Sequence, residues 1–202
     1  MAPRRRAPAA NVMSSRESAG NGWQVALLRG INVGRAKRVA MVDLRALVAE
    51  LGYGDVRTLL NSGNVVFTAP GVDPRQAAAR IEQGLAARLG VEARVMALSG
   101  AELETVVAEN PWRAAIDNPS RLLVAVLGDA DGVARLEPLV RQDWGTSRLA
   151  LGAHAAYVWC PDGVLESRLP EALGKVMGDA VTTRNWATMT KLHALAVGAR
   201  AT

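Results

Sequence analysis

Residues that could grip an anion are concentrated in the stretch 27–38, which reads L-L-R-G-I-N-V-G-R-A-K-R. Gly30 and Gly34 bracket a loop whose backbone N–H groups could hold an anion near the start of a helix. Four cations surround these glycines, with no acid among them: Arg29, Arg35, Lys37 and Arg38. The third glycine of a dinucleotide loop and the Gly-Lys-Ser/Thr end of a P-loop are both absent. The stretch is therefore either an anion-binding loop or a solvated basic turn.

A second group of donors lies near the C-terminus, in T-T-R-N-W-A-T-M-T-K-L (182–192). The pattern predicts a helix from about Thr183 to Ala196, with Thr182 or Thr183 as its N-cap. Three donors would then share one helical face: Arg184, Thr188 and Lys191. A cation at the positive end of a helix is unfavourable unless an anion offsets it. The alternative is an exposed arginine that costs a few tenths of a kcal/mol.

A third polar stretch lies within D-V-R-T-L-L-N-S-G-N-V-V-F-T-A (55–69), two apolar runs about a Ser-Gly centre. This is a hairpin pattern, with Ser62-Gly63 as a two-residue turn and Gly63 at positive φ. The amides of Asn61 and Asn64 could bond the turn backbone, or they could contact a ligand.

Several kinds of chemistry find no support in the inventory of side chains. Two histidines, His154 and His193, and one cysteine, Cys160, cannot build a structural zinc site, so no metal and no cofactor is expected. Neither G-x-S-x-G nor H-E-x-x-H occurs. His154 and Cys160 have no evident orienting partner, and we interpret them as a satisfied histidine and a buried thiol. If the protein is an enzyme, Ser62 or a bound water is the candidate reacting group.

The net charge of +5 and the pI near 10.1 are weak evidence for a nucleic-acid partner. Residues 1–22 hold four arginines and one glutamate, so only +2 of the +5 remains for residues 23–202. We expect residues 1–22 to be a disordered basic tail, and Met13 is an alternative start. No apolar stretch approaches the roughly 20 residues of a membrane span, and no secretory signal is recognisable. A single cysteine suits a reducing compartment, so the cytoplasm is expected.

The elements needed to position these residues can be predicted from local patterns. The first half, residues 23–98, reads as strand, helix, hairpin, helix and strand. Helix-capping residues mark the ends of its helices. Gly52 can end the first helix, Asp73-Pro74 can begin the second, and Gly90 can end it. This β-α-β-β-α-β order predicts a ferredoxin-like α+β sandwich.

The second half, residues 99–202, is predicted to be a smaller α+β unit packed on the first. Ser99 and Glu102 form a capping box for a helix that must stop before Pro111. Further elements follow: a strand at 122–127, a helix at 132–141, one or two strands within 149–159, and a short helix near Pro170. No sequence repeat between the halves is visible.

Taken together, these stretches resemble a bacterial family, domain of unknown function sixteen ninety-seven. The resemblance runs from about Trp23 to about Leu195 and includes N-P-W at 110–112. It implies a compact α+β protein with ferredoxin-like elements and no assigned activity. Arg35 departs from the family pattern, which more often has a small residue there. The polar positions shared with the pattern are Arg29, Asn32, Ser62, Asn64, Arg184, Asn185, Thr188 and Lys191.

Two functional hypotheses follow from these observations. The first is a non-enzymatic binding module for a phosphate-bearing ligand, such as a nucleotide or a nucleic-acid backbone. The second is a small enzyme acting on a phosphorylated or nucleotide substrate. No membrane partner is expected, and the oligomeric state stays open. The candidate anion-binding residues are Arg29, Gly30, Asn32, Gly34, Ser62, Asn64, Arg184, Asn185, Thr188 and Lys191.

Overall fold

The first half of the chain has the predicted order of elements. The computed structural model describes residues 22–32, 37–129 and 131–198. The elements of the first half are β1 (Trp23–Leu28), α1 (Met41–Glu50), β2 (Gly54–Leu59), β3 (Asn64–Thr68), α2 (Pro74–Leu89) and β4 (Val95–Ser99), and α3 (Gly100–Ala108) follows at the start of the second half. The strands form one antiparallel sheet in the order β2-β3-β1-β4. The β-α-β-β-α-β order is confirmed, while the ferredoxin-like assignment stays a prediction.

The second half repeats this arrangement, although no repeat is visible in the sequence. Its elements are β5 (Leu122–Leu127), α4 (Gly132–Val140), β6 (Arg148–Leu151), β7 (Ala155–Trp159), α5 (Leu169–Met177), a short 3₁₀ turn η1 (Gly178–Ala180), β8 (Val181–Asn185) and α6 (Trp186–Gly198). The antiparallel sheet runs β6-β7-β5-β8, the same order by position as in the first half. The second half was predicted to be smaller than the first. Among the described residues, the two halves have sheets with the same number of strands, four each.

Local signals set the ends of two helices as predicted. The side chain of Asp73 accepts hydrogen bonds from the backbone N–H groups of Arg75 and Gln76, with Pro74 as the first helical residue of α2. Gly90 ends α2 at φ 63°. Ser99 and Glu102 form the reciprocal capping box of α3. Short-range hydrogen bonds therefore position both helices before any tertiary contact is considered.

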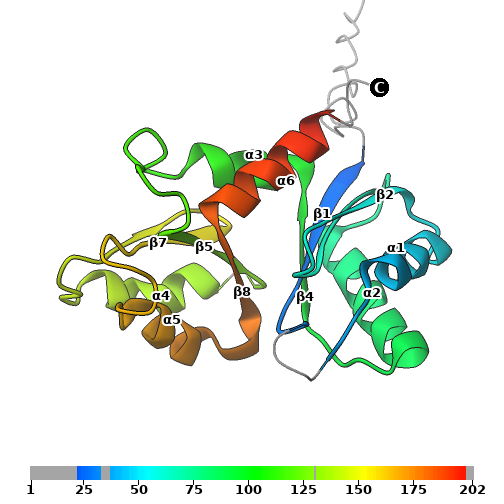
Figure 1. Cartoon of the computed structure of the whole chain (residues 1–202), viewed down its shortest axis with the longest axis horizontal. Coiled ribbons are helices and arrows are strands. Elements are labelled where there is room, and N and C mark those ends of the chain that lie inside the picture. Colours follow the sequence, from blue (N-terminus) through cyan, green and yellow to red (C-terminus); the bar gives the residue numbers. More distant parts are fainter. Residues whose placement is uncertain (1–21, 33–36, 130, 199–202) are drawn as a thin grey trace, which may run out of the picture.

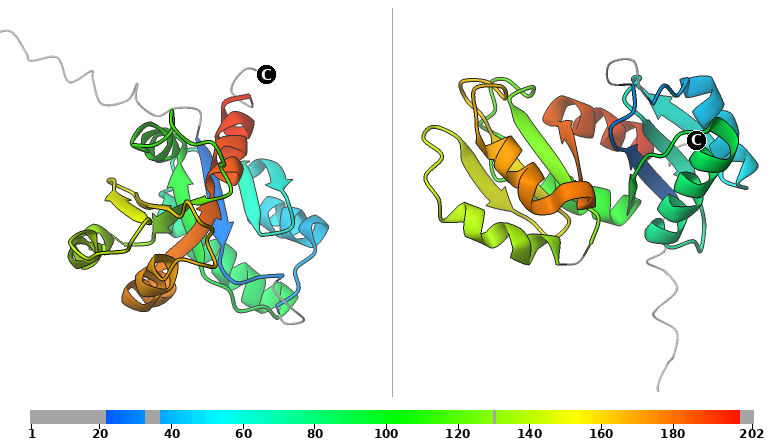
Figure 2. Two further views of the ribbon diagram at one scale, coloured as in Figure 1. Left: turned by 60° about the vertical axis from the view of Figure 1, so that its left-hand side comes forward. Right: turned by 90° about the horizontal axis from the view of Figure 1, so that it is seen from below.

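Three apolar cores divide the molecule into layers (Figure 1). Helices α1 and α2 cover the outer face of the first sheet, and α4 and α5 cover the outer face of the second. Between the inner faces lies the third core, to which α3 and α6 contribute Leu103, Val106, Met189 and Leu192. The two further views show the outer helix pairs at opposite ends of the molecule (Figure 2). The halves thus meet across a buried interior and along the strands next to it.

The predicted helix from Thr183 to Ala196 is wrong at its start. Residues 181–185 form strand β8, which pairs with β5, and α6 begins at Trp186. Valine and threonine are β-branched and favour a strand once a partner strand is available. Neither threonine is the N-cap, because Asn185 accepts the hydrogen bond of the Thr188 N–H. Arg184 therefore lies in a strand and not on a helical face with Lys191.

The hairpin between β2 and β3 differs in its turn. Leu59 pairs with Asn64, so four residues, 60–63, make the connection and the predicted two-residue turn is wrong. Gly63 has φ 73°, as predicted, but Leu60 is also left-handed at φ 57°. Two positive-φ positions allow a longer, wider loop whose carbonyl groups can point to other parts of the molecule.

Two further predictions concern the N-terminal tail and the absence of a membrane span. The predicted disordered tail falls on residues 1–22, of which 1–21 lie outside the described residues. Within the part of the chain that the structure describes, none of the helices has both the length and the apolar character needed to cross a membrane.

Replacing Gly63 by alanine should destabilise the fold more than the same change at Gly71. Both glycines have positive φ, 73° and 75°. A Cβ at Gly63 would lie 2.7 Å from Leu28 Cβ and 2.8 Å from Ile31 Cδ1, whereas nothing lies within 4 Å at Gly71. We expect Gly63→Ala to cost about 1–3 kcal/mol beyond Gly71→Ala in urea unfolding. Equal losses would show that the close approach at Gly63 has no energetic weight.

Candidate functional site

The side chain of Arg184 crosses from β8 of the second half into the first half. Its Nε donates to Asn64 Oδ1 at 2.5 Å, and its Nη2 donates to the carbonyl oxygens of Leu28 at 2.7 Å and Ser62 at 3.0 Å. The remaining N–H groups donate within β8, to Thr182 Oγ1 at 3.0 Å and Thr183 O at 2.8 Å. All five donors of the guanidinium are therefore directed to protein acceptors.

No carboxylate accepts from Arg184 among these contacts. Burial lowers the pKa of Arg184 from its ordinary value to about 10, because desolvation disfavours the charged form. The guanidinium keeps its proton at neutral pH, and neutral carbonyl and amide oxygens satisfy it. This arrangement favours a structural role for Arg184, since it has no N–H left for a ligand.

Arg29 makes the reciprocal crossing, from the end of β1 to the start of β8. Its Nη1 donates to Val181 O at 2.7 Å, and its Nε lies 3.5 Å from the carboxylate of Asp179. The Arg29 side chain is 36% exposed, and Arg184 is half-buried. The two arginines thus bind carbonyl groups of Val181 and Thr183 on the outer edge of β8 and cover an edge that could otherwise pair with another chain.

Two of the predicted asparagines support this junction. Asn64 is fully buried and donates to Leu59 O and to Ser62 Oγ, both at 2.9 Å, while its oxygen accepts from Arg184. Asn32, at φ 56°, donates to Asn61 O at 2.7 Å and bonds both backbone groups of Val39. The asparagines therefore connect the hairpin loop to the segment after β1.

The other predicted site residues are placed differently. Asn185 caps α6 by accepting from the N–H and hydroxyl of Thr188, at 2.9 and 2.8 Å. Lys191 is exposed on α6 and makes no hydrogen bond or ion pair among the described residues. Gly34 lies outside the described residues. The structure thus groups Arg29, Asn32, Ser62, Asn64 and Arg184, and it leaves Lys191 outside that network.

A cavity of about 530 Å³ lies beside Arg29. Three cations line it, and we call them the cationic rim: Arg29, Lys37 and Arg94. The backbone N–H of Arg29 donates to Arg94 O at 2.8 Å, so two of the rim residues are neighbours across β1 and β4. Acids also line the cavity: Glu82, Glu92 and Asp179. Arg94 contacts Glu82 at 3.3 Å, and the Arg94 side chain is 61% exposed.

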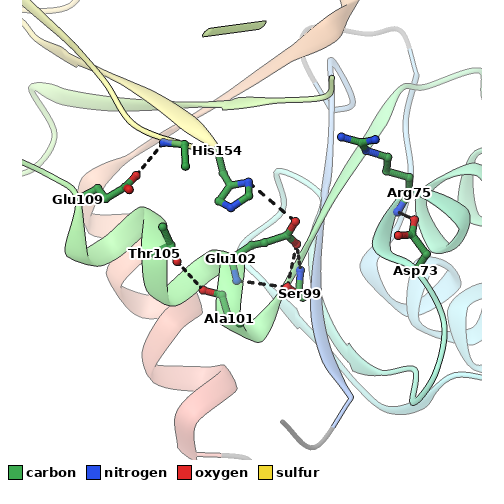
Figure 3. Close-up of polar contacts among 9 residues, drawn as sticks. Asp73, Arg75, Ser99, Ala101, Glu102, Thr105, Glu109 and His154 are labelled. Atoms are coloured by element: carbon green, nitrogen blue, oxygen red, sulfur yellow. Dashed lines mark hydrogen bonds and ion pairs between the residues drawn. The ribbon is translucent and has the colours of Figure 1, made fainter. Parts of the chain in front are cut away.

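A larger cleft of about 740 Å³ adjoins this cavity and shares Arg94 with it. It lies between the start of α2 and β4 on one side and loops of the second half on the other. His154 lies 3.9 Å from the carboxylate of Glu102, and Glu109 accepts the Ala153 N–H at 2.8 Å (Figure 3). The carboxylate of Glu109, just after α3, therefore holds the loop that carries His154, and Glu102 of α3 lies near the ring, while Arg75 projects from the opposite side.

The sequence analysis missed the residues of the cleft. His154 lies 3.9 Å from Glu102, which is also the acid of the α3 capping box. Arg94 could have been found, because in the predicted element order the last strand lies beside the first. Among the described residues, the Ser62 hydroxyl accepts from Asn64 and makes no contact with a carboxylate or a histidine. The described residues contain no cluster of three or more metal-ligating side chains.

Replacing Arg184 by lysine should destabilise the protein although the charge is kept. A lysine ammonium has three donors on one atom and cannot reach Asn64, Leu28 and Ser62 together with the β8 acceptors. The buried oxygens left without a donor should cost about 1–3 kcal/mol in urea unfolding. Arg57→Lys is the control, since Arg57 is exposed in β2 and its side chain makes no polar contact among the described residues. Equal stability of the two variants would contradict a structural role for Arg184.

Comparisons with known proteins agree with this architecture. A structure titled as that of the conserved bacterial protein SP0830 from Streptococcus pneumoniae superposes with a TM-score of 0.72. The match covers 86% of this chain and 97% of that chain at 22% sequence identity, which shows a shared fold alone. No curated protein matches the sequence. The model of the family described as "Protein of unknown function (DUF1697)" matches residues 23–157, more than half of the chain, and this α+β protein with two four-stranded sheets belongs to that family.

Proposed function

We propose that the protein is a non-enzymatic binding module for a phosphate-bearing ligand, which it holds at the cationic rim. The observation that carries the proposal is the meeting of Arg29, Lys37 and Arg94 in one cavity at the junction of the halves. A cavity of about 530 Å³ is within the usual range for small-molecule sites. A cytoplasmic location, suggested by the single cysteine, belongs to the same proposal.

The rim residues have donors to spare. Lys37 is exposed, and its side chain has no polar partner among the described residues. Arg94 uses only Nη1, toward Glu82. The contact between Arg29 and Asp179 is long, at 3.5 Å, and the Asp179 side chain is 76% exposed. Exposed pairs of this kind contribute little stability, so a phosphate that accepts charge-assisted hydrogen bonds can replace the Asp179 carboxylate.

The backbone beside Arg29 allows a ligand to approach closely. Gly30 has φ 68°, and a Cβ built at this position meets no atom within 4 Å. The site of a missing side chain therefore opens on free space, and Gly30 lines the same cavity as Arg29 and Arg94. Hydrogen bonds hold this segment on both sides of Gly30. Arg184 donates to the Leu28 carbonyl before it, and Asn32 donates to the Asn61 carbonyl of the hairpin loop. In this proposal Ser62, Asn64 and Arg184 position the rim and do not contact the ligand.

Inorganic pyrophosphate should raise the melting temperature of the wild-type protein, and Arg94→Ala should abolish the rise. At about 100 times its dissociation constant, a ligand stabilises the native state by about 2.7 kcal/mol. For a chain of this size the shift is roughly 5–10 °C, and it should shrink as salt is added. Arg80→Ala is the matched control, because Arg80 is exposed on α2 and lines neither cavity.

The Asp179 carboxylate, which competes with the phosphate for Arg29, allows a variant that should strengthen binding. Asp179→Asn removes the acid that faces Arg29, so it should tighten pyrophosphate binding, by about two- to fivefold at low salt. A shift that survives in Arg94→Ala, or a weaker affinity in Asp179→Asn, would place the anion elsewhere.

An enzyme acting on a phosphorylated substrate is the second candidate, and the Glu102–His154 pair favours it. Histidine is the commonest proton-transfer residue, and a carboxylate beside it can orient the ring. The pair lies in the cleft that adjoins the rim, at a separation of 3.9 Å. Release of phosphate from a nucleotide by the wild-type protein, lost in His154→Gln with binding retained, would favour the enzyme over a binding module.

A further inference from the structure

The outer edge of β4 presents backbone groups to the larger cleft. The Arg29 N–H donates to Arg94 O, so residue 94 belongs to the pairs that bond directly to β1. In an antiparallel pair such residues alternate with residues whose N–H and C=O groups point away. The backbone groups of Val95, Ala97 and Ser99 therefore face away from β1, on the side where β4 has no neighbouring strand.

Side-chain carboxylates cover two of these three N–H groups. Glu82 Oε1 accepts the Val95 N–H at 2.7 Å, and Glu102 Oε2 accepts the Ser99 N–H at 2.7 Å. Both contacts agree with the alternation derived from the strand register. Among the described residues nothing bonds the Val95 carbonyl, the Ala97 N–H or the Ala97 carbonyl. An acceptor, a donor and an acceptor are thus left side by side at the edge of β4.

We propose that this edge reads the base of a nucleotide whose phosphate lies at the cationic rim, an inference that rests on the proposed function. The Val95 carbonyl and the Ala97 N–H match a base that carries an amino donor next to a ring-nitrogen acceptor. Adenine and cytosine have this pattern on their Watson–Crick edges. Hypoxanthine and uracil carry the donor and the acceptor in exchanged positions. Without turning over, they can pair only with the Ala97 N–H and the Ala97 carbonyl, one group farther along β4 from Arg94, so their phosphate lies farther from the rim.

An added peptide strand does not suit the same edge. A strand pairing with β4 needs the N–H groups of Val95, Ala97 and Ser99 in succession. Two of them are occupied by the carboxylates of Glu82 and Glu102, which also block the approach of another backbone. One residue's width of free edge remains, which is enough for a planar base and too little for a strand.

The dimensions fit one ligand across both cavities. The cleft of about 740 Å³ and the rim cavity meet at Glu82, Arg94 and Asp179. Arg94 and Ala97 are three residues apart on one strand, about 10 Å. That separation is comparable to the span between the Watson–Crick edge and the phosphate of a nucleoside monophosphate. Ala78, Met177 and Ala180 also line the cleft and supply apolar surface for the faces of a base.

Calorimetric titration with five compounds tests the inference on the full chain. The compounds are the 5′-monophosphates of adenosine, cytidine, inosine and uridine, with ribose 5-phosphate as the compound that lacks a base. We expect the adenosine or the cytidine nucleotide to bind at least about tenfold more tightly than the other three, the difference made by one matched hydrogen bond. Equal affinity for all five compounds overturns base recognition and leaves the phosphate site intact. Absence of binding by all five and by pyrophosphate means that the proposed function has failed as well.

A backbone change locates the contact. Ala97→Pro removes the free N–H without removing a bond to β1, because that N–H points away from β1. The variant should bind pyrophosphate as the wild type does and should lose the discrimination between the adenosine and inosine nucleotides. In the wild-type protein, the amide resonance of Ala97 should shift on adding the preferred nucleotide, while that of Ala69, bonded to Gly22 O, should not. An unshifted Ala97 amide overturns the assignment even if the proline variant fails to fold.

Discussion

The two halves of this protein depend on a buried guanidinium that neutral oxygens satisfy. Arg184 leaves β8 and ends among the carbonyl groups of Leu28 and Ser62 and the amide oxygen of Asn64. A buried charge is costly unless every donor finds an acceptor, and here the hairpin loop of the first half supplies several of them. This loop contains two left-handed residues, Leu60 and Gly63, and its Ser62 and Gly63 carbonyl groups accept from Arg184. The junction therefore links a strand of one half to a turn of the other.

The repeated sheets place an edge strand from each half at this junction, and the two edges are treated differently. Arginines cover carbonyl oxygens on the edge of β8, through Arg29 and Arg184. Glutamates cover N–H groups on the edge of β4, through Glu82 and Glu102. Both devices prevent pairing with a further strand, which is the hazard of any exposed edge. Among the described residues, three backbone groups of the β4 edge have no partner, and these face the cleft that our proposal assigns to a base.

The polar residues that suggested a site take on separate roles in the structure. Ser62, Asn64 and Arg184 form one hydrogen-bonded network, Asn32 bonds the same hairpin loop at the Asn61 carbonyl, and Asn185 and Thr188 cap a helix. Arg29 belongs to both the junction of the halves and the cationic rim, because it crosses to β8 and also lines the cavity. The affinity of the rim for a ligand would thus depend on how Arg29 contacts β8. Displacing Asp179 from Arg29 would act on the contact between the halves.

Local chemistry in the sequence determined the features that few residues can specify. The ends of α2 lie at Asp73-Pro74 and Gly90 as predicted, and Ser99 and Glu102 cap α3. Gly63 also has the predicted positive φ. Each of these features depends on neighbours within a few residues. The order of elements in the first half follows from the same signals. Tertiary structure alone decided that residues 181–185 are a strand, since their partner β5 lies more than fifty residues earlier. It also decided the role of Arg184 and the composition of the cleft. Burial and pairing between distant segments select among local options that the chain leaves open, and no short pattern records those contacts.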